Sequence, residues 1–220
     1  MEIRTTFRKS LREIQDNILE LGSMVGKASM QAIEALKTRD LVLAQQIIDD
    51  DKKIDKKRYA IEEKCIKLIA TQQPLASDLR IIVSVLNIIT ELERIGDYAK
   101  GNANITVMIG NEPPLKPLID IPRMAEKTSE MLDRGLKAFI DHDIAAARQV
   151  SSEDDFIDGL YDQIFRELLT FMAEDPRTIT RATRLIWVAH NLERSADRVT
   201  NICERIVYMV TGKISDSKLS

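Results

Sequence analysis

Apolar residues recur at alternating intervals of four and three along the N-terminal part of the chain. This spacing places them on one side of an α-helix and is typical of the seam along which long helices pack in a bundle. The seam comprises Phe7, Leu11, Ile14, Ile18, Leu21, Val25, Ala28 and Ala32. Because the same spacing continues through most of the sequence, we expect an all-α protein with helices of about 20 to 35 residues.

Short polar turns divide this pattern into six expected helices. In the first half, Asp40 is suited to cap one helix and Pro74 to begin the next. A linker at about residues 110–120 contains three prolines, which restrict the backbone and remove amide donors, so it should separate two halves. Beyond the linker the plan repeats, with Asp143 and Pro176 in the places of Asp40 and Pro74.

The matched turns predict a duplicated fold. We expect two tandem, pseudo-symmetric three-helix bundles, over residues 1–111 and 112–220. The last helix should end at Gly212, which leaves a short polar tail. The spacing between equivalent residues is 103 for Asp40 and Asp143 but 100 for Glu93 and Glu193, so the differences in length fall near turns.

The composition indicates which kinds of partner this protein can bind and in which compartment it is found. Lys and Arg number 32 against 35 Asp and Glu, a net charge of −3, so the chain lacks the strong positive field that attracts nucleic acid. Cys65 and Cys203 lie in apolar helical patterns without CxxC spacing, which indicates buried thiols in a reducing compartment. No apolar run reaches the roughly 18 to 20 residues of a membrane span, and the first residues are too charged for a signal peptide. We expect a cytoplasmic protein.

Four acidic pairs stand out against the helical pattern. Glu93 and Asp97 follow each other at helical spacing, and Glu193 and Asp197 repeat the arrangement 100 residues later. Like charges four residues apart on a helix repel by roughly 0.2 to 0.5 kcal/mol. An unfavourable pair that occurs in both halves therefore indicates a functional or structural role. Two further pairs interrupt the apolar seams of the preceding helices: Asp51 with Asp55, and Asp154 with Asp158.

The acidic pairs should face each other in each half. Asp51 and Asp97 are equally far from Pro74 along the chain, as are Asp55 and Glu93. In an antiparallel hairpin that turns at Pro74, these side chains share one level. The same relation holds about the turn at 175–176 in the second half. The sequence therefore predicts a first quartet, Asp51, Asp55, Glu93 and Asp97, and a second quartet, Asp154, Asp158, Glu193 and Asp197.

Four carboxylates at one level repel unless some are protonated, some turn to solvent, or a cation joins them. An all-oxygen site favours hard cations such as Mg²⁺, Mn²⁺, Ca²⁺ or iron, and facing carboxylates can bridge a multinuclear cluster. The alternative is a hydrated rim in which the acids pair with Arg94, Arg194 or Lys100.

The sequence contains little that indicates a catalytic site. A di-metal carboxylate bundle uses Glu-x-x-His motifs, but no histidine follows either Glu93 or Glu193 at that spacing. His142 lies at a turn, and His190, one turn before Glu193, is better explained as a rim or core residue than as a ligand. No Gly-rich phosphate loop, nucleophile elbow or Cys/His dyad is found. An interaction protein is favoured, and a metal-dependent oxidase or phosphatase remains the alternative.

The acidic pairs, together with "LERIGDYA" at 92–99 and "QQPLASDLR" at 72–80, resemble the PhoU family of bacterial phosphate-uptake regulators over nearly the whole chain. The second half departs from the pattern, because "EDPRTITRATR" at 174–184 replaces the "PLASDLR" form. The resemblance implies a non-enzymatic negative regulator whose eight acids bind multinuclear metal clusters, with iron or zinc as the metal and manganese or magnesium as further candidates. The implied partners are the ATPase of the phosphate ABC transporter and the sensor histidine kinase of the phosphate regulon. Membrane association would come only through these partners, and a homodimer is left open.

Overall fold

The computed structural model describes the backbone of residues 2–213 and the side chains of residues 7–213. This part of the chain contains seven α-helices, one short 3-10 helix and no strand, which confirms the predicted all-α class. The elements are α1 (Glu2–Thr38), α2 (Leu41–Gln72), α3 (Ala76–Ile109), α4 (Asp120–Asp141), α5 (Ile144–Ser151), α6 (Asp154–Glu174), η1 (Pro176–Thr178) and α7 (Ile179–Thr211). From residue 214, the predicted polar tail lies outside the described residues.

The expected turns are present, with one difference at Pro74. Asp40 caps α2, because its carboxylate accepts hydrogen bonds from the amides of Val42 and Leu43 at 3.0 and 2.9 Å. Asp143 caps α5 in the same way, with the amide of Ala146 at 3.0 Å. Pro74 was expected in the first turn of a helix, but α3 begins only at Ala76, because Leu75 adopts the extended backbone of a cap.

The second helix of the second half was expected to be continuous, and this expectation was wrong. The chain forms α5 and α6 with a break at Ser152 and Glu153, whereas α2 runs without interruption over the equivalent positions. Ser152 folds its hydroxyl back onto the carbonyl of Gln149 at 2.8 Å, which is how serine competes with the regular helix. The break directly precedes Asp154, so this acid lies in the first turn of α6.

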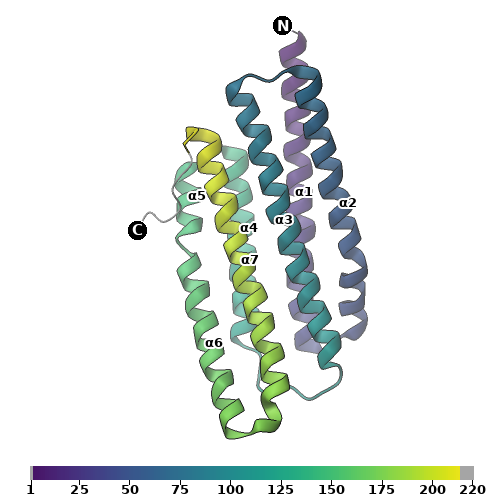
Figure 1. The fold of residues 1–220 in the computed structure, drawn as a ribbon, viewed down its shortest axis with the longest axis vertical. Coiled ribbons are helices and arrows are strands. Elements are labelled where there is room, and N and C mark those ends of the chain that lie inside the picture. The colour runs from purple at the N-terminus through teal and green to yellow at the C-terminus, as the bar shows by residue number, and fades with distance from the viewer. Residues whose placement is uncertain (1, 214–220) are drawn as a thin grey trace.

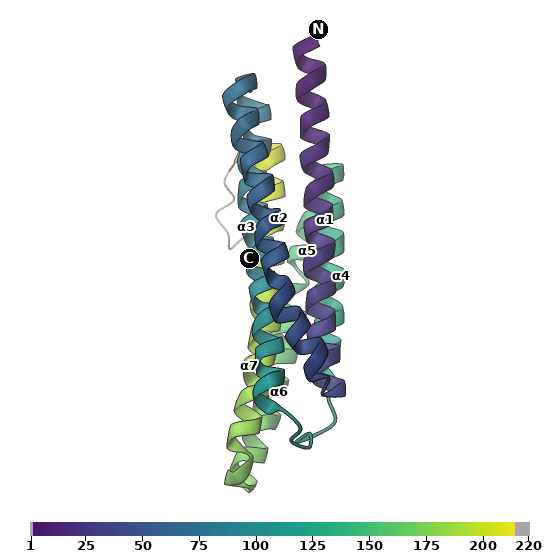
Figure 2. The same ribbon diagram turned by 90° about the vertical axis from the view of Figure 1, so that its right-hand side faces the viewer.

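The helices form an elongated bundle in two layers. In Figure 1, α3 and α7 run antiparallel through the middle, with α2 and α6 at the two outer edges. Figure 2 shows α1 and α4 together on the other side. The contact between α3 and α7 is the most extensive between any two described helices, and it joins the two halves. Each of these helices carries two apolar stripes, as a central helix must.

The two halves share one hydrophobic core. Its fully buried members include Leu92 and Ile95 on α3 and Leu192 and Val199 on α7, and it extends through all seven α-helices. Beside it lies only a small alanine-rich cluster between α1, α2 and α3 in the described part of the chain. The halves are therefore two repeats of structure packed as one body, and the quartets in α2–α3 and α6–α7 are held on a common scaffold.

The segment between Ile109 and Asp120 contains no helix, and Gly110 ends α3 with a positive φ of 62° that glycine adopts without steric cost. Among the described helices, none combines the length and apolar character that crossing a bilayer demands.

Both cysteines are buried and unpaired, and burial raises the pKa of the Cys65 and Cys203 thiols to about 12. The predicted buried thiols are therefore found.

Candidate metal centre

The structure brings the four acids of the first quartet together. Asp51 and Asp55 come from α2, and Glu93 and Asp97 come from α3. Burial, together with the charges of Asp55, Asp97 and Asp51, raises the pKa of Glu93 against the opposing effect of Arg58. Burial and the charges of Asp51 and Asp55 likewise raise the pKa of Asp97. The predicted facing of α2 and α3 at this level is therefore present, and the repulsion between the acids contributes to the raised pKa values of Glu93 and Asp97.

Two basic side chains already compensate the first quartet. Lys100 donates a hydrogen bond from Nζ to Oδ2 of Asp51 at 2.6 Å, and Asp51 is only 3% exposed. This hydrogen bond raises the pKa of Lys100. Arg58 places its Nε 3.1 Å from Oε2 of Glu93. The contact of Lys100 was among the sequence alternatives, whereas that of Arg58 was missed, although Arg58 occupies an otherwise apolar seam position of α2.

The second quartet also converges, and its most perturbed member is Asp154. Burial, followed by the charges of Asp158, Asp197 and Glu193, raises the pKa of Asp154 to about 6. Burial and Asp197 raise the pKa values of Asp158 and Glu193 as well. The acids that begin α6 therefore face those in the middle of α7, as the spacing predicted.

Among the described Lys and Arg side chains, fewer pair directly with the second quartet than with the first. Arg198 hydrogen-bonds to Glu91 and lowers the pKa of Glu193 only through its charge. Arg194 lies 3.0 Å from Asp197, as the rim alternative anticipated. The residues equivalent to Arg58 and Lys100 are Tyr161 and Thr200, which carry no positive charge. Oδ1 of Asp154 and Oε2 of Glu193 are both buried and have no hydrogen-bond partner among the described residues. Buried acceptors without a partner are costly, and a hard cation is one group that would satisfy them.

His190 lies at the edge of the second quartet. Its side chain is 53% exposed, and its Nδ1 is 3.5 Å from Oε2 of Glu193, which is beyond a normal ligand or hydrogen-bond arrangement. Its ring centroid lies 6.0 Å from that of Tyr161, at the edge of the bundle. The rim position predicted for His190 is therefore found. Arg94, the remaining candidate partner, turns to Glu91 at 3.9 Å.

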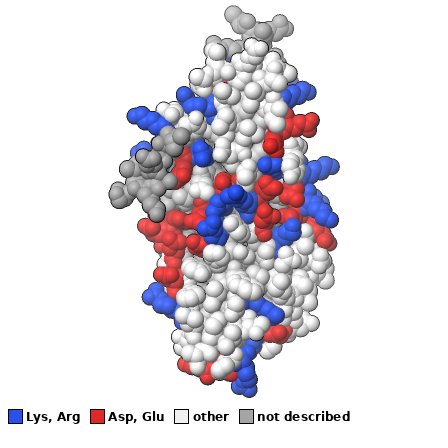
Figure 3. Space-filling view, in the orientation of Figure 1, with Lys and Arg blue, Asp and Glu red and all other residues white. Residues whose placement is uncertain are grey.

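The carboxylates converge without forming a finished coordination site. Within the described residues, no group of three or more acids, histidines or cysteines is arranged so that it could hold a metal ion as it stands. A cation at the first quartet would require side-chain rotation away from Lys100 and Arg58, and one at the second quartet would require rotation away from Arg194. Figure 3 shows Asp and Glu gathered with Lys and Arg in a band about midway along the face formed by these helices. The donor set fits a hard cation, and the second quartet fits it better.

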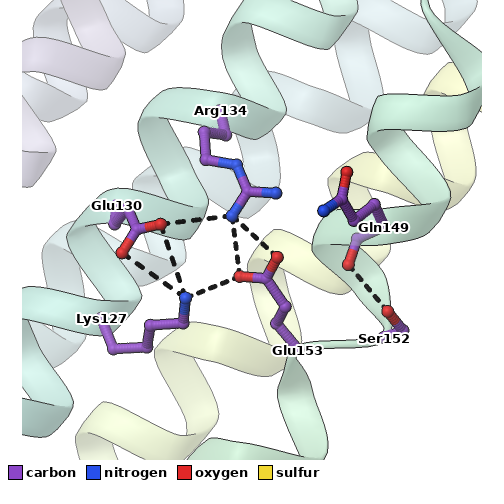
Figure 4. Close-up of polar contacts among 6 residues, drawn as sticks. All are labelled: Lys127, Glu130, Arg134, Gln149, Ser152 and Glu153. Atoms are coloured by element: carbon purple, nitrogen blue, oxygen red, sulfur yellow. Dashed lines mark hydrogen bonds and ion pairs between the residues drawn. The ribbon is translucent and has the colours of Figure 1, made fainter.

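A third charged group was missed from the sequence. Lys127, Glu130 and Arg134 project from α4 toward Glu153, which occupies the break between α5 and α6 (Figure 4). Arg134 donates from Nη1 to both oxygens of Glu153 at 2.7 and 2.8 Å, and Nζ of Lys127 lies 2.7 Å from Oε2. A signal was available, because Lys127, Glu130 and Arg134 are spaced to share one helix face.

Comparison with known proteins agrees with this architecture. The family model for the PhoU domain matches twice, at residues 18–106 and 121–206. A phosphate-specific transport system accessory protein PhoU homolog from Aquifex aeolicus is 39% identical over 94% of this chain and 93% of its own length. The phosphate-specific transport system accessory protein PhoU from Escherichia coli is 36% identical over 94% of this chain and 86% of its own length.

Solved structures of similar proteins have the same fold. The crystal structure of the phosphate transport system regulatory protein PhoU from Streptococcus pneumoniae superposes with a TM-score of 0.89 at 31% identity, covering 96% of this chain and 99% of that one. PhoU from Pseudomonas aeruginosa also gives 0.89, at 34% identity, covering 94% of this chain and 100% of that one. With a family model over most of its length and relatives of this similarity, the chain belongs to the PhoU family.

Proposed function

We propose that this chain is a metal-dependent, non-enzymatic regulator of phosphate uptake that acts in the cytoplasm. Its relatives are named as accessory and regulatory proteins of phosphate-specific transport, and these names support a role in phosphate uptake. The partners would be the ATPase of a phosphate ABC transporter and the sensor histidine kinase of the phosphate regulon. Contact with the membrane would come through these partners. Its action would be negative, damping uptake and signalling when phosphate is plentiful.

The observation that carries the metal-binding part of the proposal is the incomplete compensation of the second quartet. Asp154 combines a pKa of about 6 with a buried, unpartnered oxygen, and Glu193 contributes a second oxygen of this kind. A bound cation supplies the positive charge that neither Tyr161 nor Thr200 can supply. The donors would be the eight acids of the two quartets, and their oxygen chemistry admits iron, zinc, manganese or magnesium.

Metal binding would act on the chain by joining helices. The acids of the first quartet come from α2 and α3, and those of the second come from α6 and α7. Holding each pair of helices together at mid-length restrains its hairpin, because binding to the folded state alone stabilises that state. A restrained hairpin presents a fixed surface to a partner, so we expect partner binding to depend on bound metal.

The metal-binding part is tested by thermal unfolding with chelator and with Mn²⁺, Fe²⁺ or Zn²⁺. We compare wild type with Glu93→Gln/Asp97→Asn and with Glu193→Gln/Asp197→Asn. At a free metal concentration one hundred times Kd, one site stabilises the fold by about 2.7 kcal/mol. We expect wild type to gain stability with metal, and each double variant to lose its own part of the gain. A wild type indifferent to both chelator and metal would show that the acids form only a hydrated rim.

The regulatory part is tested by binding to a purified transporter ATPase. We expect metal-loaded wild type to retain the phosphate-transporter ATPase, and chelated protein to retain less of it. An ATPase from an unrelated ABC importer is the matched control. The competing enzyme hypothesis predicts oxygen consumption or phosphate release by the loaded protein. Turnover at enzyme-like rates that Glu93→Ala abolishes would overturn the adaptor role.

A further inference from the structure

The two repeats differ where their second helices pass the acids. In the first repeat, α2 is unbroken, so Asp51 lies in the interior of a long helix whose backbone hydrogen bonds hold it in place. In the second repeat, Asp154 is the first residue of α6, directly after the break at Ser152 and Glu153. Residues in the first turn of a helix lack part of the backbone hydrogen bonding of the interior, and helix ends fray. Something other than helix continuity must therefore hold Asp154.

A charge clamp, formed by Lys127, Arg134 and Glu153, holds that position. Arg134 donates to both carboxylate oxygens of Glu153 at 2.7 and 2.8 Å, and Lys127 reaches the same carboxylate at 2.7 Å (Figure 4). All three side chains are at most one-third exposed. Although burial opposes it, the hydrogen bonds from Lys127 and Arg134 lower the pKa of Glu153 below its ordinary value. The clamp joins α4 to the residue immediately before Asp154.

The first repeat has no clamp at the same place. The residues 103 positions before Lys127, Arg134 and Glu153 are Met24, Gln31 and Asp50. Among the described residues, Asp50 forms an ion pair with Lys53 alone, in the next turn of its own helix, and both side chains are exposed. Instead of a clamp there is a groove of about 230 Å³ between α1 and α2, lined by Met24, Gln31, Asp50 and Asp51 among others. Within the part of the chain that the structure describes, the clamp therefore occurs in the repeat whose helix is broken and not in the other.

We propose that the Lys127–Arg134–Glu153 clamp positions Asp154, and through it the second quartet, for cation binding, replacing the helix continuity that positions Asp51 in the first repeat. This inference rests on the proposed metal-binding function. The three residues are positioning residues, because none of them belongs to the quartet. Groups that orient metal ligands typically change metal affinity by about 10- to 100-fold when they are removed.

The test measures Mn²⁺ affinity by calorimetry in full-length protein carrying Glu93→Gln/Asp97→Asn, so that the second quartet dominates the signal. In this background we compare Glu153→Gln with the double change Lys127→Met/Arg134→Gln, which installs the residues of the first repeat. Asp50→Asn is the matched control. Circular dichroism checks that each variant is folded. Amide hydrogen exchange at 152–158 in metal-free protein measures how firmly the start of α6 is held when no metal is bound.

We expect both clamp variants to weaken Mn²⁺ binding about tenfold and to speed amide exchange at 152–158, and we expect Asp50→Asn to change neither. The two variants separate positioning from long-range charge. Glu153→Gln removes a negative charge near the quartet, whereas Lys127→Met/Arg134→Gln removes two positive charges. A purely electrostatic effect would weaken Mn²⁺ binding in the first and strengthen it in the second, and that outcome would overturn the proposal.

Two further outcomes also decide the matter. Unchanged Mn²⁺ affinity in Glu153→Gln, with a background protein that binds Mn²⁺, would overturn the positioning role and leave the proposed metal function standing. A background protein that binds no Mn²⁺ would overturn the assignment of a cation to the second quartet, and the positioning role with it.

Discussion

At the scale of single residues, equivalent acids of the two repeats are compensated differently. Asp51 is almost fully buried and accepts a hydrogen bond from Lys100 at 2.6 Å. Asp154, its counterpart, has a buried oxygen that no described residue hydrogen-bonds. Removing an ionised carboxylate from water is costly unless an opposite charge accompanies it. The second quartet should therefore depend more strongly on pH and on added cations.

The raised pKa of Asp154 determines the direction in which folding stability changes with pH. In the folded protein it rises from 3.8 to about 6, so the folded state binds more protons than the unfolded state between these values. The contribution of Asp154 to stability is therefore present at low pH and is lost as pH rises from about 4 to about 6. With chelator at pH 7, we expect Asp154→Asn to be more stable than wild type by about 1 to 2 kcal/mol, because solvent screens part of the effect.

Urea unfolding across this pH range measures the difference. Asp155→Asn is the control, because Asp155 is exposed and its charge contributes least among the groups that raise the pKa of Asp154. Equal pH profiles for wild type and Asp154→Asn in chelator would contradict the prediction. With Mn²⁺ present, the order should reverse, since the cation then stabilises the ionised carboxylate of wild type.

At the scale of elements, α5 is a short helix whose stability should depend strongly on the hydrogen bonds at its two ends. It has eight residues, and isolated helices shorter than about 12 to 15 residues are marginal in water. Its start depends on the cap of Asp143, and its end on the bond from the Ser152 hydroxyl to the carbonyl of Gln149. By contrast, α2 has the equivalent cap at Asp40 but continues for 32 residues.

Loss of the two caps should therefore have different local consequences. We expect Asp143→Ala and Asp40→Ala each to lower the unfolding free energy by about 1 kcal/mol. Amide exchange should rise through the whole of 144–151 in Asp143→Ala, but only in the first turn of α2 in Asp40→Ala. Hydrogen exchange with mass spectrometry measures this, and Asp141→Ala serves as an exposed control. Faster exchange confined to the first turn in both variants would show that packing alone holds α5.

At the scale of the whole molecule, polar contacts inside the α3–α7 interface set how the repeats meet. Asn191 donates from Nδ2 to Oδ1 of Asn102 at 2.9 Å, and Asn102 is 1% exposed. Glu91 accepts hydrogen bonds from Asn201 at 3.1 Å and Arg198 at 3.3 Å. Apolar contacts tolerate sliding along the helix axis, whereas paired polar groups satisfy each other in one register only.

A double-mutant cycle tests the asparagine pair. Asn191→Leu leaves the buried oxygen of Asn102 without its donor, so we expect a loss of about 1 to 3 kcal/mol in unfolding free energy. Asn102→Leu/Asn191→Leu removes both groups and should recover part of that loss, since neither polar atom is then buried alone. Denaturant unfolding of the three variants measures the coupling. Strictly additive losses would show that the hydrogen bond does not couple the repeats.

Much of the architecture was accessible from spacing. The seam from Phe7 onward, the caps at Asp40 and Asp143 and the two stripes of α3 are local features, which depend on helical period and turn chemistry. The break at Ser152 and Glu153 was not accessible, because the apolar seam from Val150 to Ile157 continues across it. The Ser152 hydroxyl competes with the helix at this point, and Glu153 meets Arg134 of another helix, 19 residues away, a contact that the period of one helix does not predict.

The amino-acid sequence by itself determined the helices, their duplication and the level at which each set of four acids meets, because periodicity and equal distances from a turn fix which residues of a hairpin face each other. Only the tertiary structure decided that the repeats share one core, that Lys100 and Arg58 reach the first quartet, and that a clamp holds the start of α6. These outcomes depend on the reach of long, flexible side chains and on packing between helices remote in sequence. Spacing along the chain shows which side chains share a helix face, but not which residues of other helices they contact.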